Sequence, residues 1–266
     1  MLQIHTIPAF EDNYFWLIQP DTLSPSSYIV DPGSAHIVHN YLTQHQLQLK
    51  GILLTHHHHD HIDGASELHD KYQCPIYGPR SPRIPQVTHY LGEGDNLSLE
   101  NVSATILAIP GHTLDHIAYL IETFPLTKTL ASSVHLFSGD TLFGAGCGRL
   151  FDGTAPLLYA ALKRIAALPD DTIIYGGHEY TLANIRFALT IEPDNAELQA
   201  RQAIETQKRQ QGIATLPTQL GIEKRTNPFL RCHLHSIHRT VEQISGKTLV
   251  TDADVFASLR CIKDRF

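Results

Sequence analysis

The sequence predicts an α/β fold followed by a smaller, all-helical region. Short apolar runs of strand length alternate with amphipathic helical patterns as far as about residue 180, and strand patterns nearly vanish after it. The chain has 266 residues, 42% of them hydrophobic, which is enough for one large packed domain or two modest ones. We therefore expect a mixed α/β domain over residues 1–180 and a helical domain over residues 181–266.

The expected strands of the first domain are short apolar runs that end at turn residues. Among the helices, residues 35–46 place apolar side chains on one stripe, and Ser34 stands before them as an N-cap. Residues 64–73 also have helical spacing, and residues 154–168 form the clearest amphipathic pattern. We expect extended segments at residues 2–7, 14–18, 28–30, 51–54, 75–77, 102–109, 116–121, 135–137 and 172–175.

Beyond Tyr180 the pattern changes almost entirely to helices. No internal repeat appears in the chain, and we expect a smaller helical domain here. The segments with apolar residues at helical intervals are residues 181–191, 196–211, 236–245 and 252–263.

Composition and charge exclude several classes of protein. No apolar run approaches the roughly 20 residues that a membrane-spanning helix needs, and the first residues lack the basic and apolar segments of a secretory signal. The four cysteines are scattered without a CxxC pair, which favours free thiols in a reducing compartment. A net charge of −7 argues against nucleic-acid binding. We expect a cytoplasmic monomer that acts on a small molecule, with no nucleic-acid or membrane partner.

Histidine is unusually abundant, with 18 residues against 20 for Lys and Arg together, and positions 55–61 read THHHHDH. Residues two apart in an extended segment point the same way, so His56 and His58 are able to face one metal ion. Asp60 and His61 are then able to turn toward a second point. Imidazole and carboxylate groups are the usual protein ligands of zinc and similar divalent metals. A surface histidine run is the simpler alternative.

Three later segments repeat one arrangement, in which an apolar strand is followed by glycine and then by a ligand-type residue. They place His112, Asp140 and His178 directly after glycine. Glycine lets the backbone turn sharply beside a bound group, although each segment alone is more typical of an ordinary strand-ending turn. Together with the histidine cluster, these segments supply enough histidine and aspartate side chains for a site with two metals.

The order of these motifs, HxHxDH, GHT, GDT and GHE, resembles the metallo-β-lactamase superfamily. Further segments resemble the glyoxalase II, or hydroxyacylglutathione hydrolase, family within it. This resemblance runs from about residue 8 to the C-terminus, and it implies a four-layer αββα metallo-β-lactamase sandwich with a smaller C-terminal helical domain. The segments that carry it are residues 10–14 (FEDNY), 146–149 (GCGR), 178–181 (HEYT), 227–231 (NPFLR) and 263–266 (KDRF).

The resemblance implies a binuclear metal site. Two metals that share a water lower its pKa toward neutrality, which gives hydroxide at physiological pH. Zinc is the first choice for a set of nitrogen and oxygen ligands, and iron and manganese also fit such a set. The implied ligands are His56, His58 and His112 for one metal, Asp60, His61 and His178 for the other, and Asp140 as the bridge.

By the same resemblance, the substrate is a glutathione thioester. The implied reaction hydrolyses S-D-lactoylglutathione to glutathione and D-lactate, the second step of methylglyoxal detoxification. A metal-bridging hydroxide attacks the thioester, and the metal-held Asp60 and Asp140 are the catalytic residues. Two cations three apart on the last helix share one face and suit the carboxylates of glutathione. The positions implied for glutathione binding are Arg149, Tyr180, Arg260 and Lys263.

Other interpretations of these residues stay open at this point. A persulfide dioxygenase of the same superfamily would use one iron and fewer ligands at the second position, and a β-lactamase would carry an export signal. A histidine-rich metal-binding protein would not need ligands spread over strand–glycine units. By themselves, Arg260 and Lys263 are typical of an exposed helix face, and Cys147 is more typical of an inert thiol than of a nucleophile.

Three positions depart from the family pattern. Asp63 stands where glycine is usual, Asp115 where a small residue is common, and Phe151 where some members have tyrosine. These differences affect the surroundings of the site rather than the metal ligands, and we interpret Asp63 as a turn residue. We expect His57 and His59 to point away from the metals, and we assign no function to the other histidines outside the ligand set.

Overall fold

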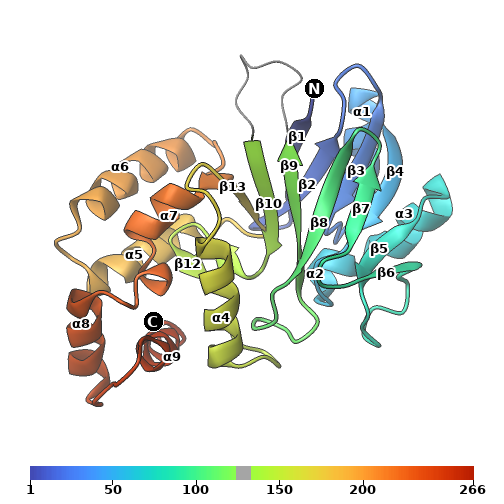
Figure 1. The fold of residues 1–266 in the computed structure, drawn as a ribbon. Coiled ribbons are helices and arrows are strands. Elements are labelled where there is room, and N and C mark those ends of the chain that lie inside the picture. Colours follow the sequence, from blue (N-terminus) through green and yellow to red (C-terminus); the bar gives the residue numbers. More distant parts are fainter. Residues whose placement is uncertain (124–132) are drawn as a thin grey trace. The chain divides into compact units, whose positions relative to one another are not determined.

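The computed structural model describes residues 1–123 and 133–266, and the chain forms two compact units. The N-terminal unit comprises Met1–Ala108 and Asp115–Gly139, and the C-terminal unit comprises Ile109–Leu114 and Asp140–Phe266. Figure 1 shows the elements of each unit. Each unit contains a buried apolar cluster of its own.

The first sheet of the N-terminal unit is made of β1 (Gln3–Ala9), β2 (Asn13–Gln19), β3 (Ser26–Val30), β4 (Gln48–Leu53), β5 (Ile76–Pro79) and β6 (His89–Leu91), in that order. It is a mixed sheet, because β1, β2 and β3 pair antiparallel whereas β3 to β6 pair parallel. The strands β2 and β3 are buried along their whole length, as expected of strands covered on both faces.

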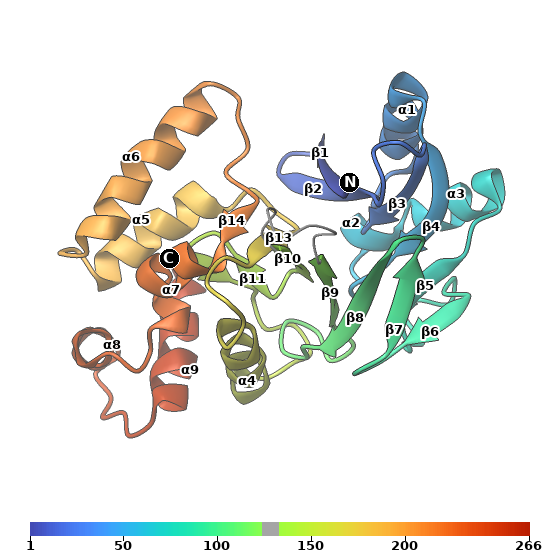
Figure 2. The ribbon, with the colours of Figure 1, turned by 45° about the horizontal axis from the view of Figure 1, so that its top comes forward.

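Two helices cover one face of this sheet, α1 (Ala35–His45) and α3 (Ala65–Tyr72). Val38 of α1 and Leu68 of α3 are fully buried in one core with Ile52 of β4. The side chain of Ser34 caps α1, as the sequence predicts, by accepting a hydrogen bond from the first turn. Both helices therefore lie against the same side of the first sheet (Figure 2).

A second sheet in the N-terminal unit pairs antiparallel and contains β7 (Asn96–Leu99), β8 (Val102–Ala108), β9 (Ile117–Thr123) and β10 (Ser133–Gly139). The hydroxyl of the fully buried Tyr119 in β9 donates a hydrogen bond to the Leu54 carbonyl at 2.8 Å. The Ile117 backbone N–H donates to the Thr55 carbonyl at 2.9 Å. These bonds fix the second sheet against the segment that leads into the histidine cluster.

The C-terminal unit is mostly helical. Two antiparallel pairs of short strands belong to it: β11 (Leu142–Phe143) with β12 (Gly146–Cys147), and β13 (Ile173–Gly176) with β14 (Thr218–Gln219). The buried carboxylate of Glu223 pairs with Arg201 and accepts the Ala145 backbone N–H, which fastens the β11–β12 hairpin to the helices. The helices are α4 (Ala155–Ala166), α5 (Thr181–Ile191), α6 (Ala196–Gln210), α7 (Leu220–Thr226), the 3-10 turn η1 (Pro228–Leu230), α8 (His235–Ser245) and α9 (Asp252–Lys263).

The predicted fold class is confirmed: two β-sheets are flanked by helices, and a helical region follows from residue 181. The helices α5 and α9 have the predicted bounds. Short elements were missed, because a few residues carry too little periodicity to be recognised: β6, β7, β11, β12, β14, α7 and α2 (His59–Ile62). Within residues 1–123 and 133–266, no helix combines the length and apolar character needed to cross a bilayer.

Candidate active site

The histidine cluster begins just beyond the end of β4. Leu54, Thr55 and His56 have no exposed surface. The neighbouring parallel strand β3 ends at Val30, so Asp31 lies beside Thr55 at the same edge of the sheet. The carboxyl ends of parallel strands meet at one edge, which is where α/β sheets place functional side chains.

Asp31 is a buried carboxylate that organises the start of this cluster. Its Oδ1 accepts the Thr55 backbone N–H at 2.8 Å, and its Oδ2 accepts the Thr55 hydroxyl at 2.6 Å. The same Oδ2 lies 3.1 Å from Nδ1 of His61. An imidazole that donates its Nδ1–H to a carboxylate presents Nε2 to a metal, so Asp31 sets the orientation of His61.

His56 and His58 lie side by side, as their spacing predicts. Nε2 of His56 is 3.1 Å from Nδ1 of His58, and the Thr55 hydroxyl is 2.9 Å from Nδ1 of His56. The ring of His116 stacks on His56 with centroids 4.6 Å apart and planes at 10°. His116 is thus a packed support for the His56 ring.

The short helix α2 follows His58 and brings Asp60 and His61 together. Nε2 of His61 lies 3.4 Å from Oδ2 of Asp60. Asn13 donates a hydrogen bond to the same Asp60 oxygen at 2.9 Å. The Asp60 side chain is 41% exposed whereas His61 is 2% exposed, so a solvent-accessible carboxylate stands beside a buried imidazole.

The intervening histidines face elsewhere, as predicted. Nδ1 of His57 pairs with Asp115 at 2.9 Å, and Arg83 contacts the other ring nitrogen at 2.9 Å. His59 pairs with Asp63 at 3.0 Å, with both side chains largely exposed. The two acidic residues that depart from the family pattern therefore contact histidines outside the predicted ligand set.

The C-terminal unit brings three predicted ligands together from separate segments. Oδ2 of Asp140 lies 3.3 Å from Nε2 of His178 and 3.5 Å from Nε2 of His112. All three residues are buried. A carboxylate oxygen flanked by two imidazole nitrogens is an arrangement that suits a divalent cation.

Backbone groups support His112. Its Nδ1 lies 2.8 Å from the Arg149 carbonyl oxygen, which accepts the Nδ1–H and leaves Nε2 for a metal. Gly148 allows this approach, because a Cβ at that position would lie 2.0 Å from the Asp140 carbonyl oxygen and 2.8 Å from Nδ1 of His112. The segment after β12 thus lies directly against two predicted ligands.

The donor chemistry in both units fits divalent metals. Groups of histidine and aspartate among the described residues place their ligand atoms close enough to share an ion. Cys147 does not supply a thiolate nucleophile, because burial raises the pKa of its thiol to about 11, although Arg260 nearby acts in the opposite direction.

The predicted glutathione-binding residues all belong to the C-terminal unit. The Arg149 side chain is 69% exposed, and its Nε lies 3.9 Å from Oδ1 of Asp264. Tyr180 stacks on His178 with ring centroids 4.7 Å apart and planes at 1°. An exposed cation and an aromatic hydroxyl therefore accompany the ligands of this unit.

The two cations of α9 differ in their surroundings. Arg260 is only 3% exposed, and its Nη1 donates to the Cys147 carbonyl at 2.9 Å. Lys263 is half-buried, with Nζ 4.9 Å from the Phe187 ring centroid. Burial, followed by the positive charge of Arg260, lowers the pKa of Lys263 to about 8. Sequence spacing predicted a shared face but not the burial of Arg260.

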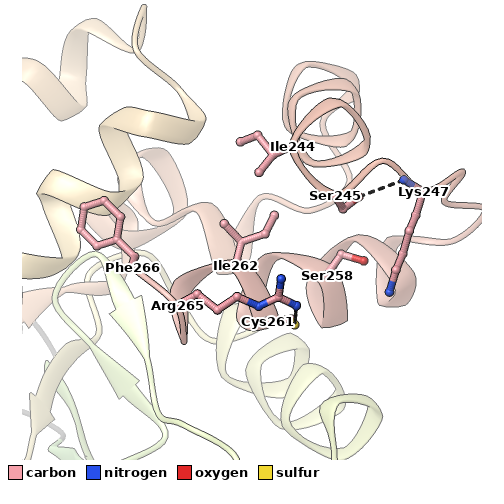
Figure 3. Close-up of a pocket in the computed structure, with 8 residues that line it drawn as sticks. All are labelled: Ile244, Ser245, Lys247, Ser258, Cys261, Ile262, Arg265 and Phe266. Carbon is pink, nitrogen blue, oxygen red and sulfur yellow. Dashed lines mark hydrogen bonds between the residues drawn. The ribbon is translucent and has the colours of Figure 1, made fainter.

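Sequence reasoning missed the residues that support the ligands. Asp31 is recognisable in principle, since it follows the expected strand that ends at Val30 as His56 follows the next one. Asn13 and the Arg149 carbonyl carry no such pattern, because their partners are distant in sequence. A pocket in the C-terminal unit between α8 and α9 contains none of the predicted site residues (Figure 3).

The matches to known protein families cover almost the whole chain. Residues 16–178 match the model of the metallo-beta-lactamase superfamily, and residues 179–266 match that of the hydroxyacylglutathione hydrolase C-terminus. A hydroxyacylglutathione hydrolase of Pseudomonas savastanoi pv. phaseolicola is 45% identical over 267 residues, covering 100% of both chains. Relatives of the same name from Pseudomonas aeruginosa and Aeromonas hydrophila are 44% identical with the same coverage.

Solved structures share the fold at lower identity. ETHE1 from Myxococcus xanthus has a TM-score of 0.63 at 22% identity and covers 99% of this chain and 98% of its own. A metallo-beta-lactamase from Staphylococcus aureus has a TM-score of 0.64 at 20% identity, covering 98% of this chain and 72% of its own. The structures show the fold, whereas the family models and the sequence relatives show that the chain belongs to the hydroxyacylglutathione hydrolase (glyoxalase II) family, metal-dependent hydrolases of the metallo-β-lactamase superfamily.

Proposed function

We propose that the protein hydrolyses S-D-lactoylglutathione to glutathione and D-lactate, the second step of methylglyoxal detoxification. Water adds to the thioester carbonyl, the carbon–sulfur bond breaks, and the glutathione sulfur leaves as a thiolate. The acyl group is released as the lactate carboxylate, and the two protons of the water go to the thiolate and to solvent. The observation that carries this proposal is the Asp140 carboxylate flanked by His112 and His178, in a chain that belongs to this family.

We assign the predicted ligands to two divalent ions, with zinc as the first choice and iron or manganese as alternatives. When bound, such ions lower the pKa of a shared water and polarise the thioester carbonyl. The assigned ligands are His56, His58 and His112 for one ion, Asp60, His61 and His178 for the other, and Asp140 for both.

The residues around these ligands hold two of the imidazoles, those of His61 and His112, in one tautomer. Asp31 accepts from Nδ1 of His61, and the Arg149 carbonyl accepts from Nδ1 of His112, so both rings direct Nε2 away from their supports. Asp60 and Asp140 are the proposed catalytic carboxylates, which orient the reacting water. The glutathione thiolate is a good leaving group, so the sulfur needs little help from an acid.

We propose that the glutathione moiety is bound by Arg149, Tyr180, Arg260 and Lys263. Glutathione carries two carboxylates, and Arg and Lys side chains form charge-assisted hydrogen bonds with such groups. The exposed Arg149 and the half-buried Lys263 support this assignment directly. In functional terms, residues 1–180 then form the metal-binding domain, which also contributes Arg149 and Tyr180 to glutathione binding, and residues 181–266 form the substrate-binding domain.

The same proposal includes a cytoplasmic monomer without nucleic-acid or membrane partners. The cysteines support the cytoplasmic location: Cys74, Cys147, Cys232 and Cys261 all carry free thiols, which a reducing compartment preserves. Elution volume and light scattering of the purified protein test the oligomeric state.

The decisive experiment measures loss of the S-D-lactoylglutathione thioester together with release of thiol. We expect activity in metal-loaded protein, its disappearance after chelation, and its return when zinc, iron(II) or manganese is added. A lactoyl thioester of N-acetylcysteamine keeps the acyl group but lacks the peptide, so we expect a much higher KM for it. Metal-loaded protein that fails to hydrolyse the glutathione thioester, or that consumes oxygen with glutathione persulfide, would overturn the proposal.

A further inference from the structure

We infer that Arg260, besides the role in glutathione binding proposed for it, is a positioning residue for the metal ligand His112. Arg260 donates hydrogen bonds to the carbonyls of Cys147 and Gly148, and the next carbonyl along the chain, that of Arg149, orients the His112 imidazole. This inference rests on the proposed metal site, because it concerns how one of its ligands is held.

The guanidinium of Arg260 is buried and committed to partners within the chain. Its Nη1 donates to the carbonyl oxygens of Cys147 at 2.9 Å and Gly148 at 3.4 Å. Its Nε and Nη2 donate to Oδ1 of Asp264 at 3.2 and 2.9 Å. The guanidinium carbon also lies 5.1 Å from the ring centroid of Phe229, within range of a cation–π interaction. Arg260 therefore joins α9 to two consecutive carbonyls of residues 147–149, which we call the hairpin segment.

The same segment contacts the metal ligands through its other groups. The Arg149 carbonyl accepts from Nδ1 of His112 at 2.8 Å, and the Phe151 backbone N–H donates to the His112 carbonyl at 3.1 Å. Gly148 is packed so closely on Asp140 and His112 that no side chain fits there. A displacement of residues 147–149 would therefore change the position or orientation of the His112 ring.

The chemistry of the side chain explains why arginine suits this place. A planar guanidinium supplies donors in a fixed fork, so it is able to bond two carbonyls on one edge and a carboxylate on the other. Lysine would bring the charge but only one nitrogen, and glutamine would bring neither the charge nor the full fork. The residue acts on His112 through the backbone, which distinguishes it from a residue that only meets substrate.

The test compares zinc affinity in Arg260→Gln, Arg260→Lys and the unaltered full-length protein, by competition with a chromophoric chelator. We expect one of the two zinc ions to bind about 10–100-fold more weakly in Arg260→Gln, the usual effect of losing support behind a ligand, with a smaller loss in Arg260→Lys. In the zinc-loaded protein labelled with ¹⁵N-histidine, the His112 Nδ1–H resonance should exchange faster with solvent. kcat should fall as well as KM rise.

Two variants from the same end of the chain serve as controls. Arg265→Gln removes an exposed arginine that lines the pocket between α8 and α9, and zinc affinity should not change (Figure 3). Lys263→Ala should raise KM and leave both zinc affinity and the His112 resonance as they are. If Arg260→Gln fails to fold, as thermal unfolding of the zinc-free protein will show, Arg260→Lys decides.

Unchanged zinc affinity and an unchanged His112 resonance in the folded Arg260 variants would overturn the inference and leave the proposed function standing. Failure of the unaltered protein to bind zinc, iron(II) or manganese would instead contradict the proposed metal site itself.

Discussion

The two units support their metal ligands by different means. In the N-terminal unit, the predicted ligands lie within residues 56–61, and the side chains of Asp31 and Thr55 hold them. In the C-terminal unit, the ligands are spread from His112 to His178, and His112 is held by a backbone carbonyl in a closely packed hairpin segment.

This difference decides what a substitution is able to disturb. A cluster supported by side chains loses a hydrogen bond when one support is replaced, and the backbone around it persists. A ligand supported by a backbone carbonyl depends instead on the position of a whole chain segment. An added side-chain atom, or the loss of a residue that bonds the segment, displaces that segment. We therefore expect the C-terminal set to be the more sensitive to small changes in volume.

The largest effect is predicted for Gly148→Ala. The new methyl group would lie 2.0 Å from the Asp140 carbonyl oxygen, so the segment and both neighbouring ligands must move. We expect a loss of about 3 kcal/mol or more in folding free energy, at the upper end of overpacking effects, and at least about 100-fold weaker metal binding. Chemical denaturation of the metal-free protein and chelator competition measure the two quantities.

Gly92→Ala is the matched control for that prediction. The nearest atom to a Cβ at Gly92 is Oδ2 of Asp95 at 3.9 Å, so the methyl group has room. Its stability and metal affinity should stay close to those of the unaltered protein. If Gly148→Ala and Gly92→Ala have similar stability and metal affinity, the hairpin segment tolerates displacement and the C-terminal set of ligands is not the more sensitive one.

The second largest effect is predicted for Asp31→Asn in the N-terminal unit. The amide retains the shape of the carboxylate but replaces the oxygen shared by the Thr55 hydroxyl and His61 with a donor. We expect a cost of about 1–3 kcal/mol from buried groups left without acceptors and about 10–100-fold weaker metal binding. Metal titration by calorimetry, with circular dichroism as the check on folding, tests this. An equal or larger loss than in Gly148→Ala would reverse the proposed order of the two units.

The same contrast explains how far the sequence alone leads. Helices with long amphipathic patterns, such as α5 and α9, have their predicted bounds. The β11–β12 hairpin has two residues in each strand and no periodicity, so its pairing appears only in the fold. Periodicity therefore predicts the layers of the molecule better than the turns that carry the site.

For the site, sequence reasoning identified ligand-type side chains but not their supports. His56 and His58 are recognisable because their spacing has chemical meaning. A backbone carbonyl such as that of Arg149 has no residue type to recognise, and the backbone acceptors of Arg260, the carbonyls of Cys147 and Gly148, lie more than 110 positions away in the chain. Arg260, whose spacing alone is typical of an exposed helix face, is buried because these distant carbonyls need a hydrogen-bond donor. No local sequence pattern indicates that need.

A third prediction concerns the pH dependence of substrate capture. Burial lowers the pKa of Lys263 to about 8, so the ammonium that would pair with glutathione is present below that pH and is lost above it. We expect kcat/KM to fall as pH rises through about 8, by roughly 10-fold for the loss of one charge-assisted hydrogen bond. Lys263→Arg should remove this decline, and Lys263→Met should show the low value at every pH. A decline that persists in Lys263→Arg would assign it to another group.

The smallest effect is predicted for Asp63→Asn, which marks the limit of side-chain support in the N-terminal unit. Asp63 pairs with His59 at 3.0 Å, but the two side chains are 60% and 91% exposed, so water competes for both. Exposed pairs of this kind contribute at most about 0.5 kcal/mol in a helix. His59 is not a proposed ligand, so metal affinity should stay within about twofold of the unaltered value, as the control for Asp31→Asn. A clear loss of metal in Asp63→Asn would mean that α2 transmits strain to Asp60 and His61, and that the N-terminal set also depends on the path of its backbone.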